Sequence, residues 1–399
     1  MVLCIAGKND IAVDLLLYLL KNENLYKKIK IVCILNKTEI EHNSWQKSLK
    51  WFCQRNQIDI VSLEDVYNIE DLIFLSLEFD QIVKPNLFLT KKLYNIHFSM
   101  LPKYKGMYTS IWPVYNGETE TGVTLHFIDS GIDTGDIIEQ EKICINEEDT
   151  AYDIYKKYIK IGTSIVIRNI KDIIENKIKN RIKQPMRFSS YYSKESIDFN
   201  NAVLNYKQTA WQIKRQVKAF AFRPYQFIKF NNISIIDVDI LDIKSNIKPG
   251  NIIEENKEYF KISTIDYDVL LYKDEFEYLL ACIQNFNNKE AKRILRGKRY
   301  IREKNNHGWT PLMVATYTNN KEIFYLLLKQ GADIYDKNWN GTNLLMYAKA
   351  CYSKTMDTEL FEYLYKLGLS IYEKDFNDKS LVDYCADEKI YRIGIVNIL

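Results

Sequence analysis

Three residues whose types suit acyl transfer lie within one short stretch of this chain. Asn95 and His97 are two residues apart, so their side chains leave the same face if they end a β-strand. Asp133 follows on a glycine-rich turn, from which its carboxylate could fold back onto the imidazole. In such a site the imidazole takes a proton from the nucleophile, the carboxylate orients the imidazole, and the amide stabilises the oxyanion. The spacing therefore predicts an acyl-transfer site.

The remaining histidines lack this context. Of the four histidines in the chain, His42 lies in a polar segment and His307 in a repeated turn, and we interpret both as structural. His126 alternates with apolar neighbours along an expected strand, which is typical of an interior histidine with satisfied hydrogen bonds. No Ser or Cys has a paired base in a recognisable motif, so a covalent intermediate is not expected.

The first third of the chain must position these residues, and it alternates apolar strands with helical segments. Strands are expected at 2–6, 29–35, 58–61 and 72–75, and helices at 10–21 and 44–56. Continuous apolar strands between helices are typical of a parallel sheet covered on both faces. The first turn, residues 7–10, lacks GxGxxG, so a Rossmann-like α/β domain without a dinucleotide is expected. Residues 75–80 would end a strand at the carboxyl edge, where such sheets bind ligands.

Three regions are expected along the chain. Residues 1–187 form the α/β domain, closed by a helix from 150 to about 177. Residues 188–271 predict a small mixed α+β domain with a helix at 210–219. Residues 272–399 predict an all-α ankyrin module, because Gly308 and Gly341 are 33 residues apart, which is the ankyrin period.

Composition excludes several classes of partner. The 55 Lys and Arg nearly balance the 52 Asp and Glu, so no global charge favours nucleic acid. Seven separated cysteines without a CxxC pair indicate neither zinc nor a disulfide framework, and a reducing cytoplasm is the simple interpretation. No signal peptide and no apolar run of membrane-spanning length is recognised. We expect a cytoplasmic protein without metal, nucleic-acid or membrane partners.

The segments NIHFSMLPKYKG and GVTLHFIDSGIDTGDII resemble the signature of the formyltransferases that use N10-formyltetrahydrofolate. Asn95, His97 and Asp133 match the family's Asn-x-His pair and distant aspartate. The resemblance implies that His97 is the general base, Asn95 the oxyanion stabiliser and Asp133 the orienting carboxylate. It also implies N10-formyltetrahydrofolate as formyl donor, without a metal. The residues implied to contact this co-substrate are Phe79, Asp80, Ser99 and Asp129.

The segment AFAFRPYQ, residues 219–226, resembles the aromatic segment of sugar nucleotide N-formyltransferases. By that resemblance Phe222 and Tyr225 stack on a nucleotide base and Arg223 approaches a phosphate, although the aromatic rings could instead join the two domains. Residues after the catalytic pair would meet the pyrophosphate and sugar, namely Lys103, Tyr108, Thr109 and Trp112. The loop at 36–43 is short and mixed in charge, unlike the basic insert that a tRNA substrate would need.

The combination of catalytic domain, aromatic segment and ankyrin module resembles sugar nucleotide N-formyltransferases of O-antigen and lipopolysaccharide synthesis. It implies a dTDP-linked amino sugar as acceptor, most specifically dTDP-3-amino-3,6-dideoxy-D-glucose, and a homodimer joined through the small domain. A 4-amino sugar, or an inactive formyltransferase-like protein that binds partners through its ankyrin repeats, are the alternatives. Trp309 and Trp339 lie near equivalent repeat positions and could stack a second nucleotide-sugar, or pack and face a protein partner.

Overall fold

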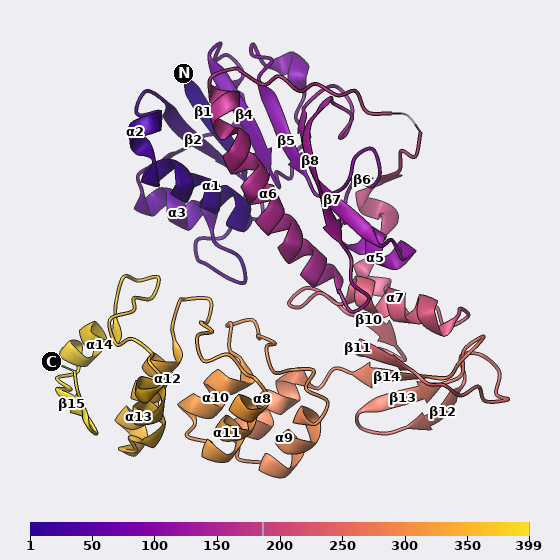
Figure 1. Cartoon of the computed structure of the whole chain (residues 1–399), viewed down its shortest axis with the longest axis vertical. Helices are drawn as coiled ribbons and strands as arrows, with labels where there is room; N and C mark the ends of the chain where they lie inside the picture. Colours follow the sequence, from indigo (N-terminus) through magenta and orange to yellow (C-terminus); the bar gives the residue numbers. More distant parts are fainter. Residues whose placement is uncertain (186, 399) are drawn as a thin grey trace. The chain divides into compact units, whose positions relative to one another are not determined.

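A computed structural model describes residues 1–185 and 187–398 of the chain. The chain forms two compact units, residues 1–273 and 274–399. Figure 1 shows an α/β sheet followed by a smaller sheet in the first unit, and helices in the second.

A seven-stranded mixed sheet organises the first unit. Five parallel strands are β1 (Val2–Gly7), β2 (Lys30–Leu35), β3 (Asp59–Ile60), β4 (Leu72–Leu77) and β5 (Leu93–His97). Two more strands, β7 (Glu120–Phe127) and β8 (Ile137–Cys144), continue the sheet in antiparallel pairing. The strand order is β3-β2-β1-β4-β5-β7-β8. The predicted Rossmann-like α/β class is confirmed, with an antiparallel edge added to the parallel sheet.

Alternating strand residues supply two cores, one on each face of this sheet. In β1, Leu3 and Ile5 belong to one buried cluster, whereas Cys4 and Ala6 belong to the other. Helices α1 (Asn9–Lys21), α3 (Leu49–Arg55) and α6 (Ala151–Ile174) cover the first face (Figure 1). The short α4 (Leu63–Val66) and the region after the 3₁₀ turn η1 (Pro85–Leu87) cover the second. Both faces are therefore buried, which explains why the strands read as continuous apolar runs.

Two helix boundaries have local causes. The helix expected at 44–56 begins only at Leu49, because the Ser48 hydroxyl caps it by accepting from Trp51 N at 3.0 Å. Helix α6 begins with a capping box between Thr150 and Asp153. Two short helices complete this part, α2 (Glu23–Tyr26) and α5 (Ile111–Asn116).

The small sheet of the first unit is antiparallel. Its order is β10-β11-β14-β13-β12, with β10 (Ile228–Phe230), β11 (Ile233–Ile240), β12 (Ile252–Glu255), β13 (Tyr259–Ile262) and β14 (Val269–Lys273). Helix α7 (Ala210–Phe220) packs on both α5 and β11. The buried cluster of the α/β sheet continues through α7 into this second sheet. The predicted domain boundary at 187/188 stays a prediction.

A connector links α6 to α7 and includes β9 (Tyr191–Tyr192) and two 3₁₀ turns, η2 (Lys194–Ser196) and η3 (Phe199–Asn201). Strand β9 pairs in parallel with β6 (Lys105–Gly106), in the loop that follows β5. The connector thus returns to the carboxyl edge of the large sheet.

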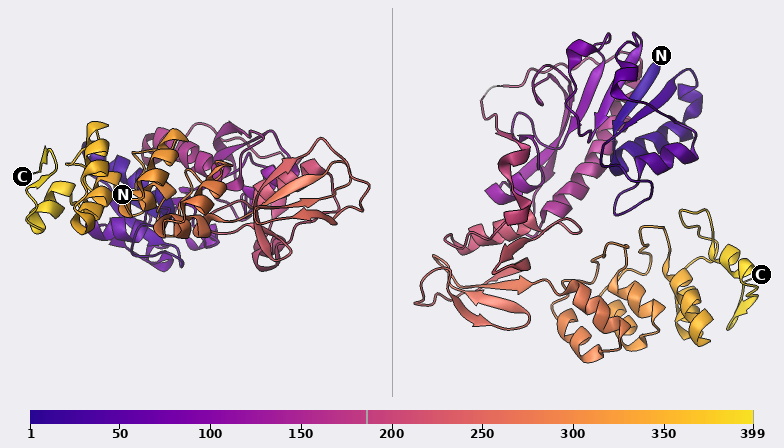
Figure 2. Two further views of the ribbon diagram at one scale, coloured as in Figure 1. Left: turned by 90° about the horizontal axis from the view of Figure 1, so that it is seen from below. Right: turned by 180° about the vertical axis from the view of Figure 1, so that it is seen from behind.

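The second unit consists of stacked helix pairs, as Figures 1 and 2 show. The helices are α8 (Phe276–Gln284), α9 (Asn288–Leu295), α10 (Pro311–Tyr317), α11 (Lys321–Lys329), α12 (Leu344–Thr355), α13 (Glu359–Lys366) and α14 (Leu381–Asp387). Gly308 and Gly341 share a φ of +78°, so the repeated turn has one backbone conformation in both copies. The last copy ends in a hairpin, β15 (Arg392–Ile393) and β16 (Val396–Asn397), instead of a second helix.

Within residues 1–185 and 187–398, no helix is both long enough and apolar enough to span a bilayer.

Candidate active site

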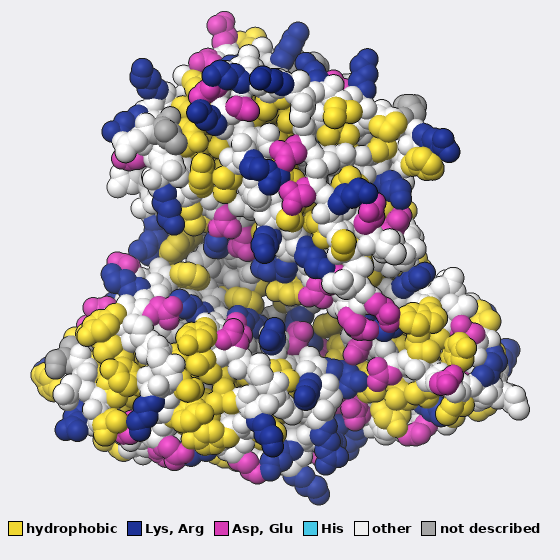
Figure 3. Space-filling model, viewed as in Figure 1, with side chains coloured by type: hydrophobic (Ala, Val, Ile, Leu, Met, Phe, Trp, Pro, Cys, Tyr) yellow, Lys and Arg dark blue, Asp and Glu magenta, His cyan; other side chains and the backbone are white. Residues whose placement is uncertain are grey.

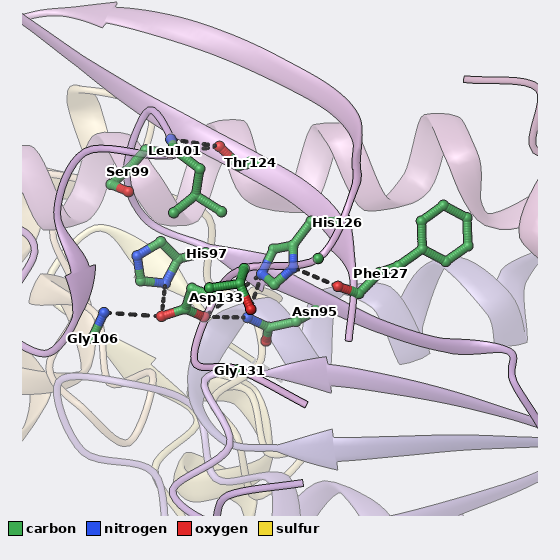
Figure 4. Close-up of polar contacts among 12 residues, drawn as sticks. Asn95, His97, Ser99, Leu101, Gly106, Thr124, His126, Phe127, Gly131 and Asp133 are labelled. Atoms are coloured by element: carbon green, nitrogen blue, oxygen red, sulfur yellow. Dashed lines mark hydrogen bonds and ion pairs between the residues drawn. The ribbon is translucent and has the colours of Figure 1, made fainter. Parts of the chain in front are cut away.

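The register between β5 and β7 brings four polar side chains to one place. Antiparallel pairing sets Asn95 opposite His126 and His97 opposite Thr124. Alternate residues share a face, so Asn95, His97, Thr124 and His126 all leave the sheet on the same side. The loop after β7 then returns Asp133 to this group (Figure 4). The three residues predicted to act together are therefore adjacent, and a fourth, His126, joins them.

Asp133 lies at the centre of the contacts. Its Oδ2 atom accepts a hydrogen bond from the Gly106 amide at 2.9 Å and lies 3.5 Å from His97 Nδ1. Its Oδ1 atom accepts from Asn95 Nδ2 at 3.3 Å and lies 3.6 Å from His126 Nε2. Figure 4 shows the carboxylate between the two imidazoles. Both carboxylate oxygens are thus held in place.

The electrostatic balance around Asp133 favours its charged form. Burial alone raises the pKa of the Asp133 carboxyl, but the positive charge that His97 and His126 carry when protonated, together with the Gly106 amide, outweighs that effect. The pKa of Asp133 therefore lies well below its usual range. A carboxylate that stays ionised can stabilise positive charge on an adjacent imidazole at neutral pH.

The His97 ring is fixed through its far nitrogen. Nε2 lies 2.8 Å from the Tyr104 carbonyl oxygen, and a carbonyl oxygen only accepts, so Nε2 carries hydrogen in this arrangement. The lone pair of a neutral ring is then on Nδ1, which faces Asp133. Nδ1 is consequently the nitrogen that can take up a proton beside a stabilising carboxylate.

His126 is interior, as the sequence indicates, but its partners are the site residues. Nδ1 lies 2.8 Å from the Phe127 carbonyl oxygen and therefore donates, which leaves Nε2 as an acceptor in the neutral ring. Nε2 accepts from Asn95 Nδ2 at 3.0 Å. Both hydrogens of the Asn95 amide are then directed, one to His126 and one to Asp133. Sequence reasoning missed this role, because the His126–Asn95 contact depends on the strand register.

A partly buried carboxylate lies at the same edge of the sheet. Glu78 follows β4, and its side chain accepts hydrogen bonds from Asn9 Nδ2 at 3.1 Å and Tyr155 OH at 2.9 Å. Its carbonyl oxygen accepts from Asn36 Nδ2 at 2.8 Å, and its φ is +58°. Burial raises the pKa of the Glu78 carboxyl. These contacts fix the start of the loop that carries Phe79 and Asp80, and sequence reasoning did not anticipate them.

The four residues predicted to bind the co-substrate lie in three different environments. Phe79 is half-buried against Phe74, and the exposed Asp80 accepts from the Lys37 amide at 3.0 Å. Ser99 is fully buried and its hydroxyl donates to the Lys103 carbonyl at 2.7 Å. Asp129 caps its own turn, accepting from Gly131 N and Thr134 Oγ1. Ser99 and Asp129 thus hold the two loops on which His97 and Asp133 depend.

The residues predicted to meet the acceptor follow β5. Lys103 pairs with Glu118 at 3.1 Å, and the Thr109 carbonyl accepts from Tyr158 OH at 3.1 Å. Tyr108 donates its hydroxyl to the Lys194 carbonyl at 3.2 Å. Trp112 stacks on Tyr192 at a ring-centroid distance of 4.1 Å, and its indole nitrogen is buried without a hydrogen-bond partner in the described part of the chain. Lys103, Tyr108 and Thr109 thus lie in the loop after β5, and Trp112 lies in α5.

The aromatic segment separates into a buried and an exposed ring. Phe222 is 5% exposed and packs against Trp45, whereas Tyr225 is 61% exposed and stacks on Phe222 at 5.4 Å. The Arg223 guanidinium lies 4.7 Å from the Phe227 ring centre. Burial of Phe222 favours the packing role that the sequence left open, and the free face of Tyr225 remains available for stacking. Trp45, also in contact with Tyr225, was missed because it lies in the distant 36–48 loop.

In the ankyrin unit the two tryptophans have separate partners. Trp309 is half-buried beside Tyr317 and Tyr347, with ring centroids 6.4 Å away in each case. Trp339 lies against the backbone of Gly308, and Lys304 Nζ is 5.0 Å from its ring centre. The two indoles therefore belong to neighbouring repeats. Gly308 precedes Trp309 in the sequence and packs against the Trp339 ring.

Figure 3 shows Lys and Arg interspersed with Asp and Glu over the face in view, without a continuous basic stripe. Among residues 1–185 and 187–398, no group of three His, Cys, Asp or Glu side chains is placed to hold a metal ion.

Known proteins match all three regions. Residues 73–170 match the formyl transferase family, residues 196–278 its C-terminal domain, and residues 278–375 ankyrin repeats in three copies. The chain is 31% identical over 223 residues to the methionyl-tRNA formyltransferase of Clostridium tetani. The aligned residues make up 53% of this chain and 71% of that relative.

Two solved structures are more similar still. The sugar 3N-formyl transferase WlaRD, solved in the presence of dTDP and 5-N-formyl-THF, is 46% identical, with a TM-score of 0.62 over 68% of this chain and 97% of its own. The N-formyltransferase from Helicobacter canadensis, in complex with folinic acid and dTDP-3-aminofucose, is 44% identical, with a TM-score of 0.62 over 69% of this chain and 100% of its own. The predicted resemblance is confirmed, and the chain belongs to the formyl transferase family, with the N- and C-terminal domains of that family followed by ankyrin repeats.

Proposed function

We propose that this protein transfers the formyl group of N10-formyltetrahydrofolate to the amino group of a dTDP-linked amino sugar. The observation that carries the proposal is the contact network of Asn95, His97 and Asp133 at the end of β5. An amide, an imidazole and an ionised carboxylate are the groups that non-covalent transfer of a formyl group to an amine requires.

The reaction assigns one task to each residue. The amine nitrogen forms a bond to the formyl carbon, and the bond from that carbon to N10 of the folate breaks after a tetrahedral intermediate. His97 takes the amine proton at Nδ1, where Asp133 stabilises the imidazolium, and the proton then passes to the leaving N10. Asn95 turns one Nδ2 hydrogen from Asp133 to the oxyanion while His126 holds the other.

The choice of acceptor is supported by the two solved structures, one a sugar 3N-formyl transferase and the other a complex with dTDP-3-aminofucose. We propose dTDP-3-amino-3,6-dideoxy-D-glucose as the acceptor, in O-antigen or lipopolysaccharide synthesis, with a 4-amino isomer as the alternative. Tyr225 is proposed to stack on the thymine, and Arg223, Lys103 and Trp112 to approach the pyrophosphate and sugar. We propose that Phe79 and Asp80, which border the sheet edge, contact N10-formyltetrahydrofolate.

The methionyl-tRNA formyltransferases are the main competing comparison. A tRNA substrate requires many phosphate contacts from basic side chains. The chain has a formal net charge of only +3, and basic and acidic side chains alternate over the face seen in Figure 3. These features support a small nucleotide-sugar over a tRNA.

For the remaining parts of the chain we propose two binding roles. The small domain is proposed to join two copies as a homodimer. The aromatic group around Trp309 and Trp339 is proposed to bind a second nucleotide-sugar, whose base would stack on an indole; a protein partner is the alternative. Both indoles are half-buried, so part of each ring stays exposed, which supports stacking.

The function is tested by incubating the full chain with N10-formyltetrahydrofolate and single acceptors while following tetrahydrofolate release by absorbance. The acceptors are the dTDP-linked 3-amino sugar, its 4-amino isomer, a UDP-linked amino sugar and methionyl-tRNA. Turnover with the 3-amino sugar, abolished in His97→Asn, is expected. Turnover with methionyl-tRNA alone would overturn the acceptor assignment, and no turnover with any acceptor would support an inactive binding protein.

A further inference from the structure

The connector after α6 runs along the loop that carries Asp133. Ile182 and Ile137 exchange backbone hydrogen bonds of 2.7 and 2.9 Å. The Arg181 guanidinium donates to Asp136 at 3.1 Å and lies 4.3 Å from the Phe127 ring centre. Ile182 therefore bridges to the edge of the sheet at the first residue of β8.

Gln184 contacts the backbone of Asp133 itself. Its Nε2 atom donates to the Asp133 carbonyl at 2.9 Å and to the Gly135 carbonyl at 2.8 Å. Asp133 has a φ of +52°, the left-handed region that a residue with a Cβ rarely adopts without support. The Gln184 amide cannot be reversed, because Oε1 would then face two carbonyl oxygens. One side chain thus holds both ends of the strained turn.

A later part of the connector, at Ser190, holds the loop that follows β5. Ser190 Oγ accepts from Tyr104 N at 2.8 Å, and the Ser190 carbonyl accepts from Lys105 N at 2.9 Å. This loop supplies the Tyr104 carbonyl to His97 and the Gly106 amide to Asp133. The connector is therefore bonded to both loops that fix the imidazole–carboxylate pair.

We infer that Gln184 is a positioning residue for the formyl transfer, acting through the Asp133 carboxylate. The inference rests on the proposed function. Without the two donated hydrogen bonds, the turn at Asp133 relaxes and its carboxylate leaves the position between His97 and the Gly106 amide. Because Gln184 acts through Asp133, its removal lowers kcat and leaves the KM of both substrates nearly unchanged.

The expected loss in kcat is about 10- to 100-fold, since displacing a catalytic group by about 1 Å costs up to about 100-fold. Gln184→Met keeps the length of the side chain and removes the amide, and Gln184→Ala shortens it. Lys183→Ala is the matched control, because Lys183 is exposed, adjacent in sequence and outside the site. The control is expected to keep wild-type kcat.

A double-mutant cycle with Asp133→Asn separates positioning from general loss of stability. If Gln184 acts through Asp133, Gln184→Met costs less than about 3-fold in the Asp133→Asn background. An equal loss in both backgrounds, or wild-type kcat in both Gln184 variants, overturns the inference.

A second measurement does not depend on turnover. The Gly106 amide donates to Asp133 Oδ2, so its hydrogen-exchange rate reports where the carboxylate lies. Exchange is expected to be at least about 10-fold faster in Gln184→Met and unchanged in Lys183→Ala. If the wild-type chain formylates none of the sugars, the proposed function fails, and this exchange rate alone decides the positioning role: an unchanged rate in Gln184→Met overturns it.

Discussion

Substitution of His126 tests whether Asn95 must be held for catalysis. His126→Asn can keep the donation to the Phe127 carbonyl, because the Asn amide nitrogen lies near the place of Nδ1, but it removes the acceptor for Asn95 Nδ2. His126→Gln reaches the place of Nε2 and restores an acceptor. Each variant keeps one of the two imidazole contacts: His126→Asn keeps the donation to the Phe127 carbonyl, and His126→Gln keeps the acceptor for Asn95 Nδ2, which lies 3.0 Å away in the structure. Activity that His126→Gln restores therefore reports the Asn95 contact.

The magnitude follows from what the Asn95 amide loses. Removing an oxyanion donor altogether costs about 100- to 1,000-fold in kcat. His126→Asn leaves the donor present but free to rotate, and fixing such a side chain costs about 0.5–1.5 kcal/mol. At about 1.4 kcal/mol for each factor of ten, kcat is expected to fall about 2- to 13-fold.

The assay is steady-state release of tetrahydrofolate with the dTDP-linked amino sugar, with both KM values measured. His126→Gln is expected to recover most of the activity lost in His126→Asn. Equal impairment of the two variants, or full activity in His126→Asn with its fold intact by circular dichroism, would refute the role of His126 in holding Asn95.

Further predictions concern five other residues. His97→Asn is expected to lower kcat by about 100- to 10,000-fold while both substrates still bind, which calorimetry measures. Tyr225→Ala is expected to raise the KM of the sugar nucleotide by the equivalent of about 1–3 kcal/mol and leave the folate KM unchanged; Phe222→Ala, which empties a buried site, is expected instead to lower the free energy of unfolding by about 3–5 kcal/mol. The pKa of Asp133 is lowered on folding, so its contribution to stability is present above its ordinary pKa and is lost as the pH falls from there; Asp133→Asn should remove up to about 1.4 kcal/mol per pH unit of this acid dependence, measured by urea unfolding between pH 5 and 3. Trp309→Ala is expected to remove a second class of nucleotide-sugar sites in a calorimetric titration, and identical single-site isotherms for variant and wild type would contradict the auxiliary site.

Local pattern predicted parallel strands of the sheet and the proximity of Asn95, His97 and Asp133, because each depends on short stretches of sequence. The strand carrying Asn95 and His97 is apolar on alternate positions, and Asp133 lies on a recognisable turn. The partners that hold them are encoded at long range. His126 meets Asn95 only through strand register, and a shift of one residue would direct it to the opposite face.

The sequence also could not predict which ring of the aromatic segment, residues 219–226, is buried. Phe222 and Tyr225 are three residues apart and similar in size, yet one is buried and the other exposed. Trp45, from a loop about 180 residues earlier, contacts both rings, and only Phe222 also packs against Tyr152 and Tyr155 of α6. A helix expected from residue 44 was also shortened, because Ser48 caps the chain there.

The connector has a consequence for how such enzymes can be recombined. Its part from Arg181 to Tyr192 lies between the regions that match the two formyl transferase domains, at 73–170 and 196–278, where a chimaera would ordinarily be cut. Yet Gln184 and Ser190 bond to the loops of the catalytic site. In a chimaera joined at 187/188, Gln184 and Ser190 would come from two different parent enzymes. Catalytic domains should therefore be exchanged together with residues up to 192, so that the transplanted site brings its own supports.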